Sequence, residues 1–215
     1  MTKIEIDNVL PDVFAGTRPT SDVWLTGCTI TRGEHVEVAA ASGEGKSTLC
    51  AFLYGYRNDY SGSIRFDGED ISTFDIERWS ALRRRHLSYV PQDLRLFDKL
   101  TALENCMIKN TLTDHKTERE ILDMLSAIGL QDRIDYPAGR LSIGQRQRVA
   151  IVRALCQPMD VLLLDEPASH LDEASNHAAA DMIAAEADRQ GAAVVVMSVG
   201  ARLLIDYSRN LQLKK

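Results

Sequence analysis

The hydrophobic positions of this chain follow two alternating patterns, one typical of strands and one of helices. Residues 161–164 and 192–197 are apolar throughout, as strands buried on both faces of a parallel sheet usually are. Strands are predicted at 4–6, 36–40, 63–71 with a turn at Asp67-Gly68, 87–90, 159–164 and 192–197, and helices at 46–55, 75–84 and 173–189. Strands that alternate with helices in this way predict an α/β fold.

One long helical segment interrupts this alternation. From Thr101 to about Asp135 the apolar residues are spaced for one helix face, and no strand signal intervenes. We therefore predict a single domain over residues 1–215, with a helical subdomain of about residues 93–157 inserted into the α/β core.

Composition narrows the function classes. Hydrophobic residues make up 45% and charged residues 26%, as in ordinary globular proteins, and the formal charge of -6 argues against a broad nucleic-acid-binding surface. The apolar run at 192–197 is far shorter than the roughly 20 residues that cross a bilayer, and the N-terminus lacks the pattern of a secretory signal. We expect a cytosolic protein whose widely spaced cysteines, Cys28, Cys50, Cys106 and Cys156, are small core residues.

A phosphate-binding loop is predicted where a strand turns into a helix, over Ser42, Gly43, Glu44, Gly45, Lys46, Ser47 and Thr48. Backbone N–H groups would surround phosphate oxygens, Lys46 would add a cation, and the Ser47 hydroxyl would face Mg²⁺. The full pattern has glycine where this chain has Ala40, and alanine fits there if its φ remains negative.

Two further segments carry candidate chemistry. Asp165 and Glu166 end a buried strand, where one carboxylate can hold Mg²⁺ through water and the next can accept a proton from an attacking water. A lone acidic pair would more simply cap a helix, but the phosphate loop in the same chain favours catalysis. Ser142 and Gln145 form a capping box, which leaves Gly144 unexplained unless this helix start is also an anion site.

Five segments occur in a familiar order: ASGEGKST, YVPQ, LSIGQRQRVAIVRAL, LLLDEP and SHLD. In this order and spacing the chain resembles the ATP-binding cassette (ABC) ATPase domains over essentially its whole length, and most of all the nucleotide-binding subunits of bacterial transporters of the lipoprotein-releasing and macrolide-exporting type. The resemblance implies a P-loop NTPase core with an N-terminal antiparallel β subdomain and an inserted helical subdomain. It also implies ATP as the substrate and Mg²⁺ as the cofactor.

In that family two cassettes pack head to tail, and each signature segment closes over ATP held by the other cassette. The resemblance implies that Ser142, Gly144 and Gln145 meet the γ-phosphate on a partner cassette, whether identical or related, and that Asp172 communicates across the dimer. Glu166 would be the general base. Ser47, Gln92 and Asp165 would lie at the metal, and Gln92 would also reach the attacking water.

The adenine contact is less specific. Phe14 is the candidate aromatic residue for stacking on the base, although its loop is long and Phe14 could equally belong to the core.

Two positions depart from the family pattern. Ile143 replaces the first glycine of the signature, which is tolerable if its side chain points away from the nucleotide. In the family a histidine after the last core strand contacts the γ-phosphate, and the matching position here is taken to be Ser198, with no histidine after His177. Serine carries no positive charge, so we predict slow hydrolysis with ATP binding largely intact.

The family also binds membrane subunits in a groove beside the Gln92 loop. Apolar residues follow that loop at Leu94, Leu96, Phe97 and Leu100, and Leu96 or Phe97 is expected to contact a partner, although all four could pack within the helical subdomain.

The predicted function is an ATP-hydrolysing subunit that drives an integral membrane permease from the cytoplasmic face of the membrane. The alternatives are a soluble cassette that acts on DNA or the ribosome, and a nucleotide-dependent clamp that scarcely hydrolyses. The segment between Gln92 and Leu141 is too short for a long coiled-coil arm of the DNA-repair type, and a single cassette differs from the tandem translation type.

Overall fold

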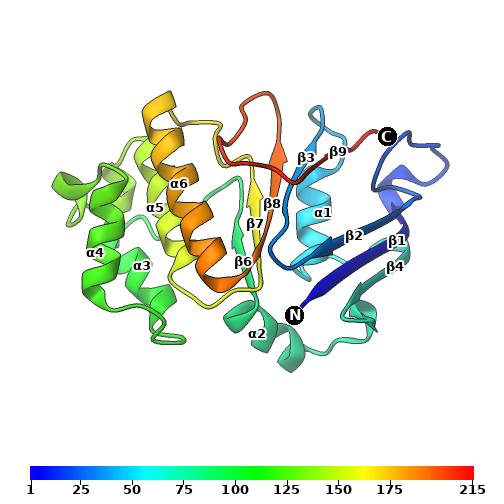
Figure 1. Ribbon diagram of the computed structural model, residues 1–215, viewed down its shortest axis with the longest axis horizontal. Helices are drawn as coiled ribbons and strands as arrows, with labels where there is room; N and C mark the ends of the chain where they lie inside the picture. Colours follow the sequence, from blue (N-terminus) through cyan, green and yellow to red (C-terminus); the bar gives the residue numbers. More distant parts are fainter.

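The structure is a computed structural model that describes residues 1–215, and it is built around two sheets (Figure 1). The first sheet is antiparallel with strand order β2-β1-β4-β5, and the second is parallel with strand order β6-β7-β8-β3-β9. The strands are β1 Lys3–Pro11, β2 Gly27–Thr31, β3 His35–Ala39, β4 Tyr60–Phe66, β5 Glu69–Asp70, β6 Leu87–Val90, β7 Val161–Asp165, β8 Ala193–Ser198 and β9 Arg209–Gln212.

Helices pack against the parallel sheet, and a group of helices lies to one side of it (Figure 1). They are α1 Lys46–Leu53, α2 Ile76–Arg85, α3 Ala102–Asn110, α4 Glu118–Ala127, α5 Ile143–Leu155 and α6 Glu173–Gln190, with short 3-10 turns η1 Asp12–Phe14, η2 Ile71–Thr73, η3 Gln131–Arg133 and η4 Ala138–Arg140. None of these helices is long and apolar enough to cross a bilayer.

Alternate residues of the central strands face two separate cores. On β7, Leu163 packs with α1 and the antiparallel sheet, whereas Leu162 and Leu164 pack with α5 and α6. Every residue of β7 and β8 is buried. The apolar runs that predicted these two strands therefore reflect burial on both faces, as expected for a parallel sheet.

The helices α3, α4 and α5 lie between β6 and β7 in the chain and form the body at the left of Figure 1. Their apolar faces share a core of their own, which includes Ile121, Leu125, Val149 and Val152. Thr101, Thr117 and Ser142 each close a capping box at the start of these helices. The fold class predicted from the sequence is confirmed: an α/β core with an antiparallel sheet and a helical insertion.

Two strands, β2 and β9, were not predicted from the sequence. β2 is short, with alternating buried and exposed residues, and β9 is an edge strand of the parallel sheet with a largely polar sequence, RNLQ. Both are specified by pairing with β1 and β3 rather than by their own hydrophobicity. The four cysteines are free and buried, as predicted.

Candidate functional site

The phosphate loop joins β3 to α1, and its tightest point is Gly45. This residue caps α1 with φ of 99°, a left-handed conformation that favours glycine. A side chain there would also lie 3.0 Å from Phe14 and 3.1 Å from Trp24. Ala40 does not adopt a positive φ, so alanine is accommodated at that position as expected.

Lys46 is folded over this loop. Its Nζ donates hydrogen bonds to the carbonyl oxygens of Ala40 at 3.2 Å and Ala41 at 2.7 Å. Burial lowers the pKa of Lys46, and the nearby carboxylates of Glu166 and Asp165 act in the opposite direction. The ammonium group is thus held by the loop carbonyls, and the two acidic residues at the end of β7 lie near enough to favour its charge.

Asp165 has the properties of a metal ligand. It is fully buried, and its Oδ1 atom has no hydrogen-bond partner. Burial raises the pKa of Asp165, and the nearby Ser47 hydroxyl opposes that shift. Ser47, Gln92 and Asp165 line one cavity, so the three oxygen-bearing side chains predicted at the metal lie together. An orphaned buried carboxylate oxygen beside a hydroxyl and an amide is a donor set that fits Mg²⁺.

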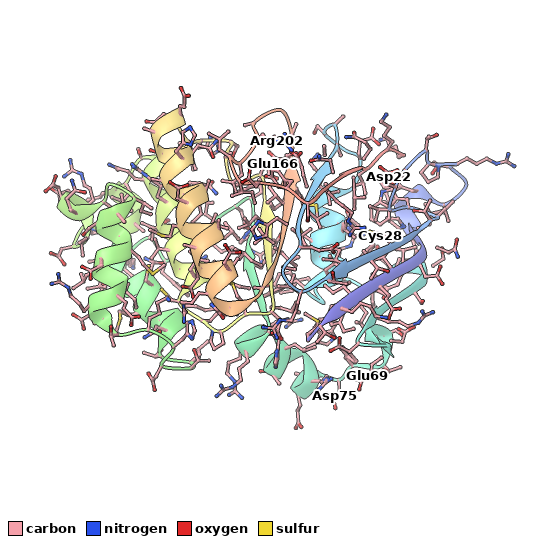
Figure 2. All side chains as sticks on the ribbon, in the orientation of Figure 1. Asp22, Cys28, Glu69, Asp75, Glu166 and Arg202 are labelled. Carbon is pink, nitrogen blue, oxygen red and sulfur yellow. The ribbon has the colours of Figure 1, made fainter.

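Glu166 follows Asp165 in a strained conformation. Its φ is 53°, in the left-handed region that non-glycine residues rarely occupy. Its N–H still donates to the Met197 carbonyl on β8 at 2.9 Å. The backbone therefore changes direction immediately after β7 ends. Gln92 Nε2 lies 3.4 Å from Glu166 Oε2. In Figure 2 Glu166 stands at the edge of the parallel sheet where β7 and β8 end.

These residues meet in a cleft of about 380 Å³. Of the predicted residues, the cleft is lined by Phe14, Ser42, Gly43, Gly45, Lys46, Ser47, Thr48, Gln92 and Glu166. The side chain of Glu44 turns away, toward the backbone N–H of Lys215, and Glu44 lines a different cavity. Two unpredicted residues, Val13 and Arg57, complete the cleft wall.

Phe14 belongs mainly to the core. It is 8% exposed and packs edge-on against Trp24, with ring centroids 6.5 Å apart. Its neighbour Val13 is 68% exposed and also lines the cleft. The sequence left two roles open for Phe14, and the structure favours the one in the core. The exposed residue at the rim of the cleft is instead the aliphatic Val13.

The signature segment lies at the start of α5, outside this cleft. The Ser142 N–H donates to Gln145 Oε1 at 2.9 Å, and the Gln145 N–H donates to Ser142 Oγ at 3.2 Å, which confirms the capping box. Ser142 is exposed at the surface. The Ile143 side chain is 52% exposed, so it avoids the chain's own core.

The glycine at position 144 is explained by tertiary packing, which the capping box alone did not reveal. A Cβ atom there would lie 2.6 Å from the carbonyl oxygen of His170. The first turn of α5 therefore rests against the backbone of the segment between β7 and α6. In that segment Asp172 is exposed and caps α6, accepting a hydrogen bond from the Ser175 N–H at 2.8 Å. That bond lowers the pKa of Asp172.

Ser198 does not follow the last core strand but is the final residue of β8. It is buried, and its hydroxyl donates to Glu37 Oε1 at 2.9 Å. The other carboxylate oxygen of Glu37 forms an ion pair with Arg202, with 2.9 Å between Oε2 and the guanidinium nitrogen. The residue that follows the strand is Val199. Ser198 was expected to follow the strand and to face the nucleotide. In the structure it lies within the strand, and its hydroxyl is bonded to Glu37, a buried acid that no sequence pattern indicated.

A groove lies beside the Gln92 loop, with a volume of about 360 Å³. Leu94 is buried in the core, Leu96 and Leu100 are half-buried, and Phe97 is 55% exposed and lines the groove. Phe97 is therefore the exposed member of the predicted apolar set, and the groove also contains basic residues that the sequence patterns did not single out.

Comparison with known proteins agrees with this geometry. Residues 26–169 match the family described as ABC transporter. The chain is similar to the macrolide export ATP-binding/permease protein MacB of Salmonella choleraesuis, with 34% identity over 196 residues that cover 90% of this chain and 30% of that protein. It is also similar to the lipoprotein-releasing system ATP-binding protein LolD of Syntrophotalea carbinolica, with 31% identity over 209 residues that cover 96% of this chain and 92% of that protein.

Solved structures show the same fold. The dimeric structure of MJ0796, a bacterial ABC transporter cassette, superimposes with a TM-score of 0.78 at 26% identity and covers 91% of this chain and 87% of that one. The present chain thus corresponds to nearly all of LolD but spans only 30% of the macrolide export protein.

Proposed function

Because the chain belongs to the ABC transporter family, we propose that it is an ATP-hydrolysing cassette that pairs head to tail with a second cassette and powers an integral membrane partner from the cytoplasmic side. In this proposal ATP binding closes the pair, and hydrolysis or product release opens it. The resulting movement is passed to the membrane partner.

The observation that carries the proposal is the separation of two half-sites on one chain. The cleft holds the phosphate loop, Gln92 and Glu166, whereas Ser142 and Gly144 lie outside it on an exposed helix start. A helix N-terminus with free N–H groups attracts phosphate. A second cassette that turns its α5 toward this cleft would therefore complete the site, and this chain would do the same in return.

The residues of the cleft support hydrolysis by positioning and electrostatics. Lys46 and the loop N–H groups would hold the β- and γ-phosphates. Ser47, Gln92 and Asp165 would hold Mg²⁺, which neutralises charge on the phosphate oxygens when bound. Glu166 would accept the proton of the attacking water, and its left-handed backbone turns it from the strand axis toward the cleft. Gln92 would orient that water through its amide.

The absence of a histidine after β8 supports slow turnover. Ser198 is engaged with Glu37 inside the sheet, and Val199 offers only a hydrocarbon side chain. Neither residue can donate a charged hydrogen bond to the γ-phosphate, so the charge that develops there is stabilised less. ATP binding, which depends on the phosphate loop, would be little affected.

The groove beside Gln92 is the proposed contact with the membrane partner. Phe97 at its rim is half exposed although it belongs to an apolar segment, and Tyr56 and Ile108 are exposed nearby. Large exposed aromatic residues around a groove are typical of protein interfaces.

The proposal is tested with the Glu166→Gln variant, which keeps the cleft but loses the base. We expect it to form dimers with Mg·ATP in analytical ultracentrifugation, and the wild type to do so only transiently. Adding Ser142→Arg, which places a bulky cation at the exposed helix start, should abolish the dimer. A Glu166→Gln protein that stays monomeric at high concentration with Mg·ATP would contradict head-to-tail pairing. Recovery of the tagged wild-type chain from membranes with an integral membrane protein tests the second half of the proposal.

A further inference from the structure

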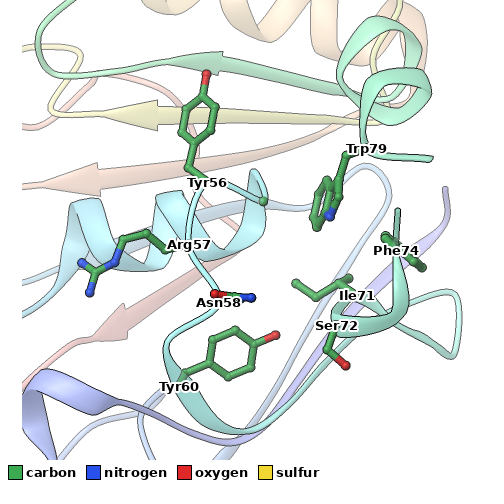
Figure 3. Close-up of a pocket in the computed structure, with 9 residues that line it drawn as sticks. Tyr56, Arg57, Asn58, Tyr60, Ile71, Ser72, Phe74 and Trp79 are labelled. Carbon is green, nitrogen blue, oxygen red and sulfur yellow. The ribbon is translucent and has the colours of Figure 1, made fainter. Parts of the chain in front are cut away.

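The nucleotide cleft contains a second basic side chain besides Lys46. Arg57 lines the same cleft of about 380 Å³, and no other lysine or arginine does. It lies in the segment between α1 and β4, which carries none of the motifs that identify the family. Figure 3 shows its side chain extending away from the aromatic rings of a neighbouring pocket, formed by Tyr56, Phe74 and Trp79, and alongside α1. The side chain of Arg57 is therefore directed toward the phosphate loop.

The guanidinium group of Arg57 is oriented by Asp59. Its Nε donates to Asp59 Oδ1 at 2.8 Å, and its Nη2 forms an ion pair with Oδ2 of the same carboxylate. The third nitrogen, Nη1, instead donates to Thr48 Oγ1 at 3.4 Å. A guanidinium carries five N–H groups in a rigid planar fork. The pair with Asp59 therefore leaves Nη1 available beside Thr48.

Thr48 marks a place in the cleft that favours an anion. It is the third residue of α1, so its backbone N–H has no acceptor within the helix. The positive end of the helix dipole lies at the same place. Arg57 adds a full positive charge to these partial charges. An anionic group bound beside Thr48 is therefore met from two sides, by the helix start and by Nη1 of Arg57.

The position of Arg57 along the cleft identifies the phosphate that it meets. The residues proposed to hold Mg²⁺ share a cavity at one end of the cleft, and neither Thr48 nor Arg57 lines that cavity. Val13 and Phe14, at the rim where the base is expected, likewise line the cleft but not that cavity. In ATP the α-phosphate lies between the base and the two outer phosphates. Arg57 thus stands where the α-phosphate passes.

The segment that carries Arg57 is held in place from both sides. The Arg83 guanidinium lies 5.2 Å from the centroid of the Tyr56 ring, and Tyr60 packs on Phe52 of α1 with ring centroids 4.7 Å apart. These contacts fix the backbone on each side of position 57. Little conformational freedom is therefore lost when the Arg57 side chain meets a ligand.

We propose that Arg57 binds the α-phosphate of ATP, as a second cation beside Lys46. This inference rests on the proposed function, because it concerns the nucleotide of the same cleft. ATP and ADP share the α-phosphate, which takes no part in the bond that hydrolysis breaks. Arg57 therefore strengthens binding of both nucleotides equally, and it lowers KM without raising kcat.

The alternative is an ordinary surface ion pair, since the side chains of Arg57 and Asp59 are 40% and 41% exposed. Such pairs contribute little to stability, and this one would leave nucleotide affinity unchanged. The two readings differ in the affinity for nucleotides and in its dependence on salt.

The experiment uses the whole chain and three variants. Arg57→Gln removes the charge but keeps hydrogen-bonding groups, and Arg57→Lys keeps the charge but loses the planar fork. Arg65→Gln is the matched control, because Arg65 is 38% exposed on β4, pairs with Asp7 at 3.8 Å and lies outside the cleft. Isothermal titration calorimetry with Mg·ADP and with a non-hydrolysable ATP analogue gives Kd and the number of binding sites, and steady-state ATPase assays give KM and kcat.

We expect Arg57→Gln to raise the Kd of both nucleotides by about fivefold or more, as loss of a charge-assisted hydrogen bond does. The ratio of the two Kd values and the number of sites should not change. Because hydrolysis is expected to be slow, KM should rise by the same factor, while kcat should change by less than about twofold. Affinity should also depend less on salt than in the wild type. Arg57→Lys should lie between the two, and Arg65→Gln should match the wild type.

Four results would overturn the inference. Wild-type affinity of Arg57→Gln for both nucleotides would show that Arg57 only pairs with Asp59, and the proposed function would stand. Weaker binding of the ATP analogue alone would assign Arg57 to the outer phosphates. An equal loss for both nucleotides with unchanged salt dependence would show that Arg57 only shapes the loop through Thr48. Failure of the wild type to bind either nucleotide would reject the proposed function and this inference together.

Discussion

The Ser198 hydroxyl donates a hydrogen bond to Glu37 Oε1 at 2.9 Å, across two neighbouring parallel strands. Arg202 lies on the other oxygen of the same carboxylate, and Figure 2 places it at the sheet edge together with Glu166. Burying a carboxylate costs free energy unless its oxygens are hydrogen-bonded or paired with a cation. Ser198 is therefore a structural partner of Glu37.

This hydrogen bond predicts different outcomes for the two positions at which a histidine could be introduced. Val199→His places an imidazole just after β8, and we expect kcat to rise by about tenfold or more because a charged donor reaches the γ-phosphate. Ser198→His removes the bond to Glu37 and should lower the unfolding temperature without a gain in turnover. Steady-state ATPase assays and thermal unfolding of both variants, with Val199→Ala as the control, check this. A gain with Ser198→His alone would return the role to Ser198.

Gly144 provides a test of local packing. A Cβ atom there would lie 2.6 Å from the His170 carbonyl oxygen, which is backbone and cannot turn aside. We expect Gly144→Ala to reduce the free energy of unfolding by about 1–3 kcal/mol, as overpacking usually does. Urea denaturation measures the change. Ile143→Ala is the control one residue away, and its exposed side chain should make it nearly neutral, so equal losses in the two variants would refute the argument.

The exposed rim of the nucleotide cleft yields a prediction about affinity. Val13 is 68% exposed there and offers no aromatic face to a base. Val13→Tyr should strengthen ATP binding by about 1 kcal/mol, or roughly fivefold in Kd, through stacking on adenine. Phe14→Leu should instead lower stability, because Phe14 packs on Trp24 in the core. Equilibrium titration with a fluorescent ATP analogue measures the affinity, and a loss confined to Phe14→Leu would support Phe14 as the base contact.

The buried ion pair of Glu186 predicts a pH dependence of stability. Burial opposes ionisation of Glu186, but hydrogen bonds from Arg189 and Lys116 outweigh it and lower the pKa to about 2. Because the folded pKa lies below the ordinary value of about 4.5, the stabilisation is complete above pH 4.5 and is lost as the pH falls toward 2.

The variant Glu186→Gln isolates this contribution. The difference in free energy of unfolding between wild type and variant should be roughly 3 kcal/mol at pH 7 and should shrink steadily below pH 4.5. Urea denaturation at pH 7, 5, 4 and 3 follows it. Glu118→Gln at the start of α4, which has no ion pair, serves as the control, and a wild-type advantage that does not change with pH would argue against the ionised pair.

The sequence by itself determined the local elements and the chemistry of the phosphate loop. The apolar runs of β7 and β8, the glycines before α1 and the capping box of α5 depend on neighbouring residues along the chain, and each of them was visible in the periodicity or the residue types. The segments that carry the family resemblance likewise lie within short stretches of sequence.

Only the tertiary structure decided which residues these elements bring together. It placed Ser198 inside β8 beside Glu37, buried Phe14 while exposing Val13, and set the Gly144 turn against the backbone of His170. It also gathered Lys109 from α3 and Arg153 from α5 in one groove. These relationships join residues from separate elements, and whether a charge is buried or a side chain is exposed depends on the packing of the whole chain, which no local pattern records.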